Sequence, residues 1–341
     1  MSRINSDDEV KKFQDLKIAN IKKYFDKYDV DIEYIWLKGN IRRKINMAVN
    51  SDNQLGTIQE KTHKIIPTQN IIFANQEINN LLVVMQKFLN KFPRGKISQI
   101  NITNFDNILD LIISVSQNLN SEDEIKIVNF AKENNVNVSL KINGAIFLLF
   151  LQQPNFIEIN SLKIEMPNDA FIQPSKEGLN IILDFLQKQI SAIQPVKKNL
   201  DLYSGCALYS FALASQIKHS SCFEGSENMV KAIKTNAKYL GLNAKISAFT
   251  RDLYSDPLNY KELNNYDNII INPPRNGAEP QILNIAKSSV KSLQYISCNP
   301  QSLARDTKIL IDSNYKLTNI ISLDQFYLTN HQEVLTNFVK I

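Results

Sequence analysis

Hydrophobic positions near the start of the chain recur at helical spacing. Between residues 7 and 27 the apolar side chains of Val10, Phe13 and Ile21 fall on one side of a run that is otherwise rich in lysine and aspartate. This period predicts an amphipathic helix. We assign it to an N-terminal helical segment, residues 1–30.

Short alternating runs dominate the next part of the chain. Between about residues 32 and 164, runs such as 45–49 and 136–140 alternate apolar and polar positions, and glycine- or proline-containing turns separate them. A longer helical pattern covers residues 77–88. The mixture predicts an α+β domain over residues 31–168 and leaves its strand order open.

A regular alternation of strands and helices begins near residue 196. Repeated strand–helix units predict an α/β fold with a mostly parallel, doubly wound sheet, in which ligands bind at the carboxyl ends of the strands. The expected helices cover residues 209–217 and 227–240, and the expected strands cover residues 199–203, 221–224, 246–249, 268–271, 294–297, 317–321 and 334–339.

Composition and charge narrow the class of protein. The chain has 341 residues, of which 43% are hydrophobic and 21% charged, so it can form two packed domains. The net charge of +5 favours an anionic partner. The polar start and the lack of a long apolar run predict neither a secretion signal nor a membrane span, and therefore a cytoplasmic protein.

Three cysteines, Cys206, Cys222 and Cys298, show no C-x-x-C spacing. This pattern disfavours a disulfide framework and predicts no metal site and no iron–sulfur cluster. Three free thiols suit a reducing compartment. Whether any of these cysteines has a chemical role then depends on its position in the fold.

The first two strands end in residues that suit an adenosyl ligand. Gly205 follows the first strand and allows a tight turn, and Glu224 lies 224 − 205 = 19 residues further on, a usual distance for an acid that binds ribose hydroxyls. The full G-x-G-x-x-G pattern is absent. An ordinary strand–helix turn therefore remains an alternative to a cofactor site.

The fourth strand ends in the segment Asn272-Pro273-Pro274-Arg275. Two prolines restrict the backbone and hold Asn272 at the sheet edge. In sheets of this kind such a segment marks the place where a planar base meets a methyl donor. A rigid turn without function is the alternative.

Cys298 directly follows the fifth strand and precedes Asn299-Pro300. A cysteine is most often a small buried apolar residue, and we assign Cys222 to the core on that ground. Cys298, by contrast, is placed at a strand end, where we expect the helix-leading loop to lower the pKa of its thiol. The position predicts a nucleophile.

Glu333 lies 333 − 298 = 35 residues after Cys298, and His331 precedes it by two positions. The period of two predicts that both side chains point to the same side. A surface Glu–His pair without function is the alternative. His63 and His219 are interpreted as surface or loop residues.

These strand ends resemble those of the RNA 5-methyluridine methyltransferases, bacterial enzymes that act on ribosomal RNA and on the T-loop of transfer RNA. The resemblance runs from about residue 38 to the C-terminus. Its strongest parts are residues 272–277 (N-P-P-R-N-G), 297–306 (S-C-N-P-Q-S-L-A-R-D) and 324–333 (D-Q-F-Y-L-T-N-H-Q-E), and its weaker parts are residues 41–44, 56–63 and 171–173.

The resemblance implies a class I methyltransferase domain, Rossmann-like with a mostly parallel seven-stranded sheet, over residues 169–341, preceded by an RNA-binding domain. It implies S-adenosyl-L-methionine as methyl donor, Cys298 as catalytic nucleophile and Glu333 as base. The residues that would contact the cofactor are Gln173, Tyr203, Glu224, Asp252 (in the adenine pocket) and Asn272.

The sequence departs from the family in several places. Cys206-Ala207-Leu208 replace the later part of the glycine loop, Asn272 stands where many members have Asp, and Tyr327 replaces a usual proline. We expect a short form, without iron–sulfur cysteines or an added β-barrel, that acts as a monomer.

The expected substrate is RNA, with 23S ribosomal RNA favoured over transfer RNA. Basic runs could bind its phosphates, although a solvated surface explains them equally. Two other functions remain open: an amino-group methyltransferase of the N-P-P type, which Arg275 disfavours, and an RNA-binding protein with a degenerate cofactor site. The basic residues concerned are Lys38, Arg42, Arg43, Lys44, Lys91, Arg94 and Lys96.

Overall fold

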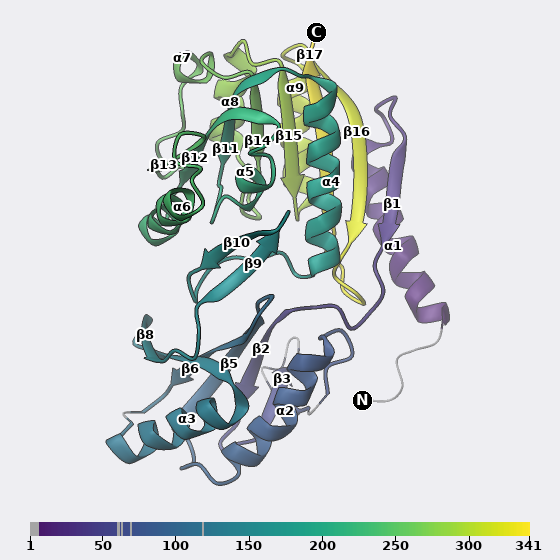
Figure 1. Ribbon diagram of the computed structural model, residues 1–341. Helices are drawn as coiled ribbons and strands as arrows, with labels where there is room; N and C mark the ends of the chain where they lie inside the picture. Colours follow the sequence, from purple (N-terminus) through teal and green to yellow (C-terminus); the bar gives the residue numbers. More distant parts are fainter. Residues whose placement is uncertain (1–6, 60–61, 63, 69, 118) are drawn as a thin grey trace. The chain divides into compact units, whose positions relative to one another are not determined.

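The computed structural model describes residues 7–59, 62, 64–68, 70–117 and 119–341 (Figure 1). His63 and part of the weak motif at 56–63 lie outside these residues. Backbone contacts divide the chain into two compact units. Unit one comprises Met1–Leu37, Ala170–Gln173 and Glu177–Ile341, and unit two comprises Lys38–Asp169 and Pro174–Lys176.

Unit one is built on an eight-stranded sheet with the order β1-β16-β17-β15-β14-β11-β12-β13. Strand β17 runs antiparallel to both of its neighbours, and all other pairs are parallel. The strands are β1 (Ile32–Trp36), β11 (Val196–Leu202), β12 (Ile217–Glu224), β13 (Ile246–Thr250), β14 (Asn268–Ile271), β15 (Ser292–Ser297), β16 (Tyr315–Asp324) and β17 (Glu333–Lys340).

Helices cover both faces of this sheet (Figure 1). Buried side chains of α1, α8 and α9 join the apolar face of the central strands in one continuous core, with Phe25, Ile282 and Leu303 fully buried in it. The helices are α1 (Asp7–Phe25), α4 (Lys176–Ala192), α5 (Leu208–Ala212), α6 (Glu227–Tyr239), α7 (Tyr260–Leu263), α8 (Glu279–Lys287) and α9 (Pro300–Ile311).

The α/β expectation for this part of the chain is confirmed, with two differences in detail. The sheet has an additional edge strand, β1, which residues 32–36 of the predicted α+β domain supply and which pairs with β16. The helix expected over 209–217 ends at Ala212, because the chain must turn and begin β12 at Ile217.

A buried row of amide side chains crosses the sheet of unit one. Asn268 donates hydrogen bonds to Asn199 Oδ1 (2.8 Å) on one neighbouring strand and to Gln294 Oε1 (2.9 Å) on the other. Gln294 donates to Asn337 Oδ1 (2.9 Å), and Asn337 donates to Thr318 Oγ1 (2.7 Å). The row connects β11, β14, β15, β17 and β16, and fixes their mutual register.

Unit two contains a seven-stranded mixed sheet and a two-stranded hairpin, with the larger sheet in the order β4-β3-β2-β5-β6-β7-β8. Helices α2 (Gln76–Leu89) and α3 (Ser121–Asn134) pack on this sheet through one core. The strands are β2 (Lys44–Val49), β3 (Leu55–Ile58), β4 (Ile65–Pro67), β5 (Ile97–Asn104), β6 (Leu109–Val115), β7 (Val136–Ile142), β8 (Ala145–Phe150), β9 (Asn155–Ile159) and β10 (Leu162–Met166).

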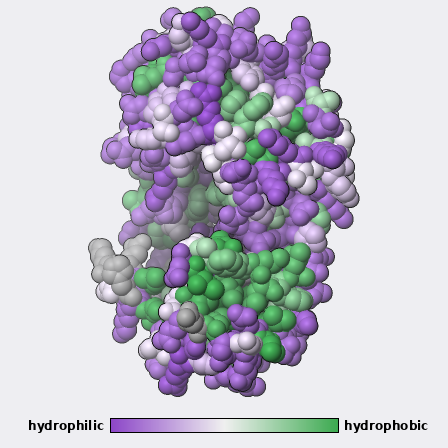
Figure 2. Space-filling model, turned by 90° about the vertical axis from the view of Figure 1, so that its left-hand side faces the viewer, coloured by the Kyte–Doolittle hydropathy of each residue, from purple (hydrophilic) through white to green (hydrophobic). Residues whose placement is uncertain are grey.

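The edge strand β8 exposes a group of apolar side chains. Ile146, Phe147 and Leu148 are 38%, 55% and 56% exposed. Figure 2 shows hydrophobic side chains gathered on this side of unit two. Among the described residues no helix is long and apolar enough to cross a membrane.

Candidate active site

A pocket in unit one lies at the carboxyl end of the sheet. Strand β11 ends at Leu202, and the chain then turns through positive φ at Tyr203 (57°) and Gly205 (54°). A side chain at position 205 would meet no atom within 4 Å, so the positive φ of the turn, and not a lack of space, favours glycine here. The pocket is lined by Phe171, Gln173, Leu179, Tyr203, Ser204, Gly205, Cys206, Leu208, Tyr209 and Asn272.

Glu224 closes the neighbouring strand β12 and holds the glycine turn. Its carboxylate accepts hydrogen bonds from the backbone N–H groups of Gly205 (2.9 Å) and Ser226 (2.9 Å), one on each oxygen. A carboxylate has about four acceptor sites, so two bonds leave capacity for a ligand hydroxyl. The side chain is only partly buried.

Asp252 lies in an exposed turn after β13. It accepts hydrogen bonds from the Tyr254 N–H (3.0 Å), the Ser255 N–H (3.4 Å) and the Ser255 hydroxyl (2.7 Å), and these bonds lower the pKa of its carboxyl. Within the described residues, Asp252 therefore already has a structural role in shaping its own turn.

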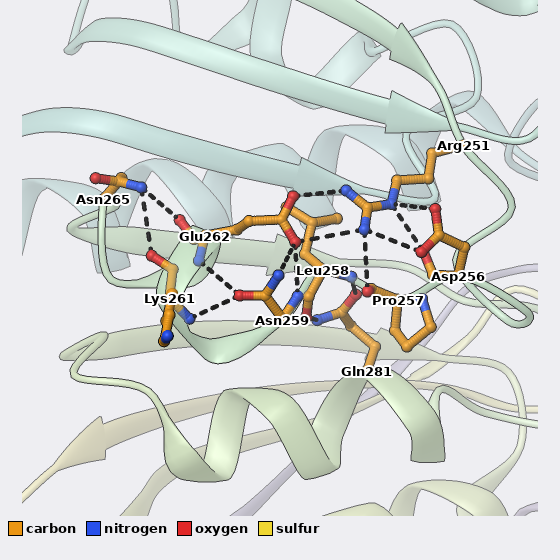
Figure 3. Close-up of polar contacts among 9 residues, drawn as sticks. All are labelled: Arg251, Asp256, Pro257, Leu258, Asn259, Lys261, Glu262, Asn265 and Gln281. Atoms are coloured by element: carbon orange, nitrogen blue, oxygen red, sulfur yellow. Dashed lines mark hydrogen bonds and ion pairs between the residues drawn. The ribbon is translucent and has the colours of Figure 1, made fainter.

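Arg251 fixes the turn that carries Asp252. Its guanidinium donates to Glu262 Oε1 (2.7 Å), to both the carbonyl and the carboxylate of Asp256, and to the Pro257 carbonyl (Figure 3). Gln281 of α8 holds the next residue, Leu258, through its N–H (2.9 Å) and carbonyl (3.1 Å). The turn is thus attached to two helices.

A chain of hydrogen bonds connects the lining of the pocket to Glu333. The Tyr209 hydroxyl accepts from Asn272 Nδ2 (3.2 Å) and from Gln173 Nε2 (3.0 Å). The Gln325 amide donates to Gln173 Oε1 (2.9 Å) and to Glu333 Oε2 (3.2 Å). These bonds place Asn272, Gln173 and Glu333, which three separate motifs of the sequence contribute, in one local network.

The sheet register brings Cys298 next to Glu333. Strands β15 and β17 pair antiparallel, with Ser297 opposite Val334. Continued by one residue, this register sets Cys298 opposite Glu333. The charge of Glu333 acts on the pKa of the Cys298 thiol, which agrees with close approach. Cys298 is half-buried and Glu333 is 4% exposed.

Burial changes the acid–base properties of both groups. Loss of hydration raises the pKa of Glu333 to about 7, while the hydrogen bond from Gln325 opposes the shift. Burial also raises the pKa of the Cys298 thiol, Glu333 raises it further, and Arg275 opposes this. The expectation of a lowered thiol pKa is therefore wrong for the protein alone, because desolvation and the neighbouring carboxylate outweigh the helix-leading loop.

His331 and Glu333 occupy different environments. His331 is exposed, and its Nδ1 lies 3.2 Å from Nη2 of Arg275, whereas Glu333 is buried. The alternative of a surface Glu–His pair is therefore wrong, because β17 begins at Glu333 and takes its side chain into the interior. His219 lies in β12, between β11 and β13, and not in a loop as one interpretation had it; it is partly buried, and its Nδ1 lies 3.2 Å from the Ala244 carbonyl.

Sequence reasoning missed Tyr209 and Gln325, which link the predicted residues. Tyr209 lies in the short helix α5, as the first residue of the helix expected over 209–217, and Gln325 lies inside the motif at 324–333. Only the register of β16 and β17, which sets Leu323 opposite Glu333, shows that Gln325 can reach Glu333.

The basic residues of unit two differ in their exposure. Arg43 is 4% exposed and pairs with Asp106 (3.4 Å), and burial lowers the pKa of Lys44. Arg43 is therefore a buried, paired residue, which fits neither of the two alternatives, phosphate binding or a solvated surface. Lys38 and Lys91 are exposed.

A sequence profile of the tRNA (Uracil-5-)-methyltransferase family matches residues 17–339. The chain belongs to this family. The resemblance drawn from the three motifs is thereby confirmed. The matched residues include parts of both units of this protein.

Individual relatives share moderate identity with this family member. It is 25% identical over 312 residues to the 23S rRNA (uracil(1939)-C(5))-methyltransferase RlmD of Haemophilus parainfluenzae, a match that covers 88% of this chain and 70% of that protein. An uncharacterized RNA methyltransferase of Mesorhizobium japonicum is 31% identical over 179 residues, which cover 52% of this chain and only 42% of that protein.

The fold is also found in a solved structure. The tRNA (uracil-54, C5)-methyltransferase of Pyrococcus abyssi, crystallised with S-adenosyl-L-homocysteine, superposes with a TM-score of 0.77 at 17% identity. The match covers 97% of this chain and 83% of that one. It confirms the Rossmann-like methyltransferase architecture of unit one, together with an α+β unit.

Proposed function

We propose that the protein transfers a methyl group from S-adenosylmethionine to carbon 5 of a uridine in RNA, with Cys298 as the covalent nucleophile and Glu333 as the base. One observation supports this most directly: the β15–β17 register, continued by one residue beyond Ser297 and Val334, sets a half-buried thiol opposite a buried carboxylate, which hydrogen bonds connect to the lining of the pocket. Family membership gives the reaction class.

The pocket fits an adenosyl cofactor. Asn272 and Gln173 present amide groups, and the Tyr203 hydroxyl is buried without a hydrogen-bond partner, which leaves a polar atom for a ligand to satisfy. We assign Gln173, Tyr203 and Asn272 to the methionine side and Glu224 and Asp252 to the adenosine side. When bound, the cofactor supplies a methyl group on a positively charged sulfur.

Carbon 5 of uracil is a weak nucleophile until a group adds to carbon 6. The Cys298 thiolate forms a bond from Sγ to carbon 6, and the ring electrons move to make carbon 5 nucleophilic. Carbon 5 would then take the methyl group from the bound cofactor, whose sulfur would keep the electron pair of the broken bond and leave as a neutral thioether. Glu333 removes the proton from carbon 5, the double bond between carbons 5 and 6 re-forms, and Sγ leaves as the thiolate.

The acid–base state of Glu333 suits this step. A base works best when its pKa is close to the operating pH, and burial raises the pKa of Glu333 to about 7. The rise in the Cys298 pKa means that the free enzyme keeps its thiol mainly protonated. We infer that the thiolate forms only once the substrates occupy the site.

The substrate proposed is 23S ribosomal RNA. The RlmD relatives named for a 23S rRNA uridine match most of this chain. Transfer RNA is the second candidate, because the family and the Pyrococcus abyssi enzyme are named for it. The target base must leave its stack to reach Cys298, so a loop is preferred over a continuous helix. We place the protein in the cytoplasm, as a monomer.

Mapping of 5-methyluridine in 23S ribosomal RNA and transfer RNA, with and without the gene, tests the substrate. Loss of one 23S methyluridine supports the proposal, and its restoration by the unaltered gene but not by Cys298→Ala supports the nucleophile. A methylated adenine instead would indicate an amino-group methyltransferase. Absence of cofactor binding in calorimetry would favour an RNA-binding protein without activity.

A further inference from the structure

Helix α1 holds both ends of the segment that carries Glu333. Lys17 donates to Asp324 Oδ1 (2.6 Å) and to the Phe326 carbonyl (3.1 Å), next to the residue that ends β16. At the other end of the segment, Gln332 donates to the Lys17 carbonyl (3.2 Å). These three hydrogen bonds attach both ends of residues 324–332, the segment that leads into Glu333, to Lys17 of α1.

The ion pair between Lys17 and Asp324 is buried. Lys17 is 2% exposed and the Asp324 side chain 10%. Placing a lysine in the interior costs free energy unless a partner compensates its charge, and removal of either partner leaves the other as an uncompensated buried charge. Asp324 also accepts a hydrogen bond from the Phe326 N–H (3.0 Å), so Lys17 fixes the backbone on both sides of Gln325.

Gln325 connects this fixed backbone to Glu333, the proposed base. Its side-chain amide donates to Glu333 Oε2 (3.2 Å) and to Gln173 Oε1 (2.9 Å), and the residue is 2% exposed. The pair at Asp324 fixes the backbone from which Gln325 extends. A displaced Asp324 would therefore move the side-chain hydrogen bond that Gln325 donates to Glu333.

We propose that Lys17 is a positioning residue for Glu333, acting through Asp324 and Gln325 to hold the carboxylate where it meets carbon 5 of the bound base. This inference rests on the proposed function. Lys17 lies 324 − 17 = 307 positions from Asp324, and no strand-end motif of the sequence includes it. A small misplacement of a catalytic group can reduce a rate about a hundredfold.

The test compares Lys17→Met with Lys22→Met, which alters an exposed lysine of the same helix. Both proteins are assayed with S-adenosylmethionine and a uridine-containing RNA that the unaltered protein methylates. We expect Lys17→Met to lower kcat by about tenfold or more while KM for S-adenosylmethionine changes by less than about twofold. The Lys22→Met protein should match the unaltered one.

A second readout separates positioning from general loss of structure. A misplaced base slows removal of the carbon 5 proton, so the bond from Sγ to carbon 6 persists and a protein–RNA adduct accumulates on denaturing gels. An unfolded protein forms no adduct. Because Lys17→Met leaves Asp324 uncompensated, the double variant Lys17→Met/Asp324→Asn is measured as well and should show the same adduct.

The outcomes distinguish the two proposals. An active unaltered protein whose Lys17→Met and double variants turn over normally, without adduct, overturns this inference alone. Failure of the unaltered protein to make 5-methyluridine in any RNA overturns the proposed function and this inference with it.

Discussion

At the scale of single residues, Glu333 is a buried carboxyl group, and its pKa differs strongly from that of a carboxyl group in water. Burial raises its pKa to about 7 from an ordinary value of 4.5. The native state therefore holds a proton that the unfolded chain has lost between these two values. Stability from this group is complete below pH 4.5 and is lost as the pH rises through 7.

Glu333→Gln should remove this loss, because glutamine cannot ionise. We expect the variant to gain free energy of unfolding relative to the unaltered protein between pH 5 and pH 8, by about 2 to 3 kcal/mol. Urea denaturation at both pH values measures the difference. Glu133→Gln, at an exposed position of α3, should show no such gain. An equal difference at both pH values would mean that Glu333 is not buried as described.

Tyr209 tests the network that lines the pocket. Tyr209→Phe removes the hydroxyl that accepts from Gln173 and Asn272 and leaves both amides without that partner. We expect the affinity for S-adenosylmethionine to fall about five- to twentyfold, which corresponds to about 1 to 2 kcal/mol. Calorimetry measures it, with Tyr239→Phe, an 82% exposed tyrosine, as control. Unchanged affinity would separate this network from cofactor binding.

The sequence alone could single out Cys298 and Glu333 as candidate residues, because each stands in a motif whose residues suggest a chemical role. It could not identify Tyr209, Gln325 or Lys17, since their importance depends on which strands are neighbours. The same limitation explains why the predicted lowering of the Cys298 pKa is wrong. The sequence shows the loop before α9, but Glu333 is 35 positions away from Cys298, and only the pairing of β17 with β15 brings its carboxylate near.

At the scale of elements, most strands of unit one were predictable because buried parallel strands are continuous apolar runs. Strand β1 was not, since an edge strand that joins the sheet from another part of the chain has no local sequence signal. The strand order of unit two could not be predicted either, because only tertiary packing decides it.

The amide row across the sheet provides a stability prediction. Asn268→Ala removes two donors and leaves Asn199 Oδ1 and Gln294 Oε1 buried without them. We expect a loss of about 2 to 4 kcal/mol in the free energy of unfolding. Urea denaturation should show a loss of only about 0.5 kcal/mol in the free energy of unfolding for Asn265→Ala, an exposed control in the turn after α7. Equal losses would contradict a structural role for the row.

The turn after β13 yields a prediction about binding. Arg251→Met removes the guanidinium that holds Asp256 and Glu262, so the turn that carries Asp252 should lose its fixed shape. Weaker binding of S-adenosylmethionine, by about tenfold, is expected in calorimetry. Lys261→Met, at an exposed position on the neighbouring helix α7, serves as the control. If both variants bind alike, the turn does not contribute to the cofactor site.

At the scale of the whole molecule, the chain differs from the predicted three-part division. The helix and strand at 7–37 belong to the same compact unit as the catalytic sheet, and unit two begins at Lys38. A net charge of +5 over the whole chain suits RNA, but the buried Arg43 shows that individual cations cannot be assigned to phosphate from sequence alone.

Binding of RNA should depend on the salt concentration, because contacts with phosphates release bound counterions. We expect the affinity of the inactive Cys298→Ala protein for its RNA to fall by roughly twentyfold between 50 and 200 mM salt for every three phosphates that it neutralises. Filter binding at several salt concentrations gives the slope. A salt-independent affinity would place recognition on uncharged contacts.

The central claim is a covalent bond between Cys298 and uracil. Peptide mass spectrometry of Glu333→Gln protein, incubated with S-adenosylmethionine and substrate RNA and then digested with protease and nuclease, tests it directly. Our account predicts a methylated uridine nucleotide attached to the peptide that contains Cys298, and none in the Cys298→Ala/Glu333→Gln double variant. An attachment at another residue, or methylation by the double variant at the normal rate, would contradict it.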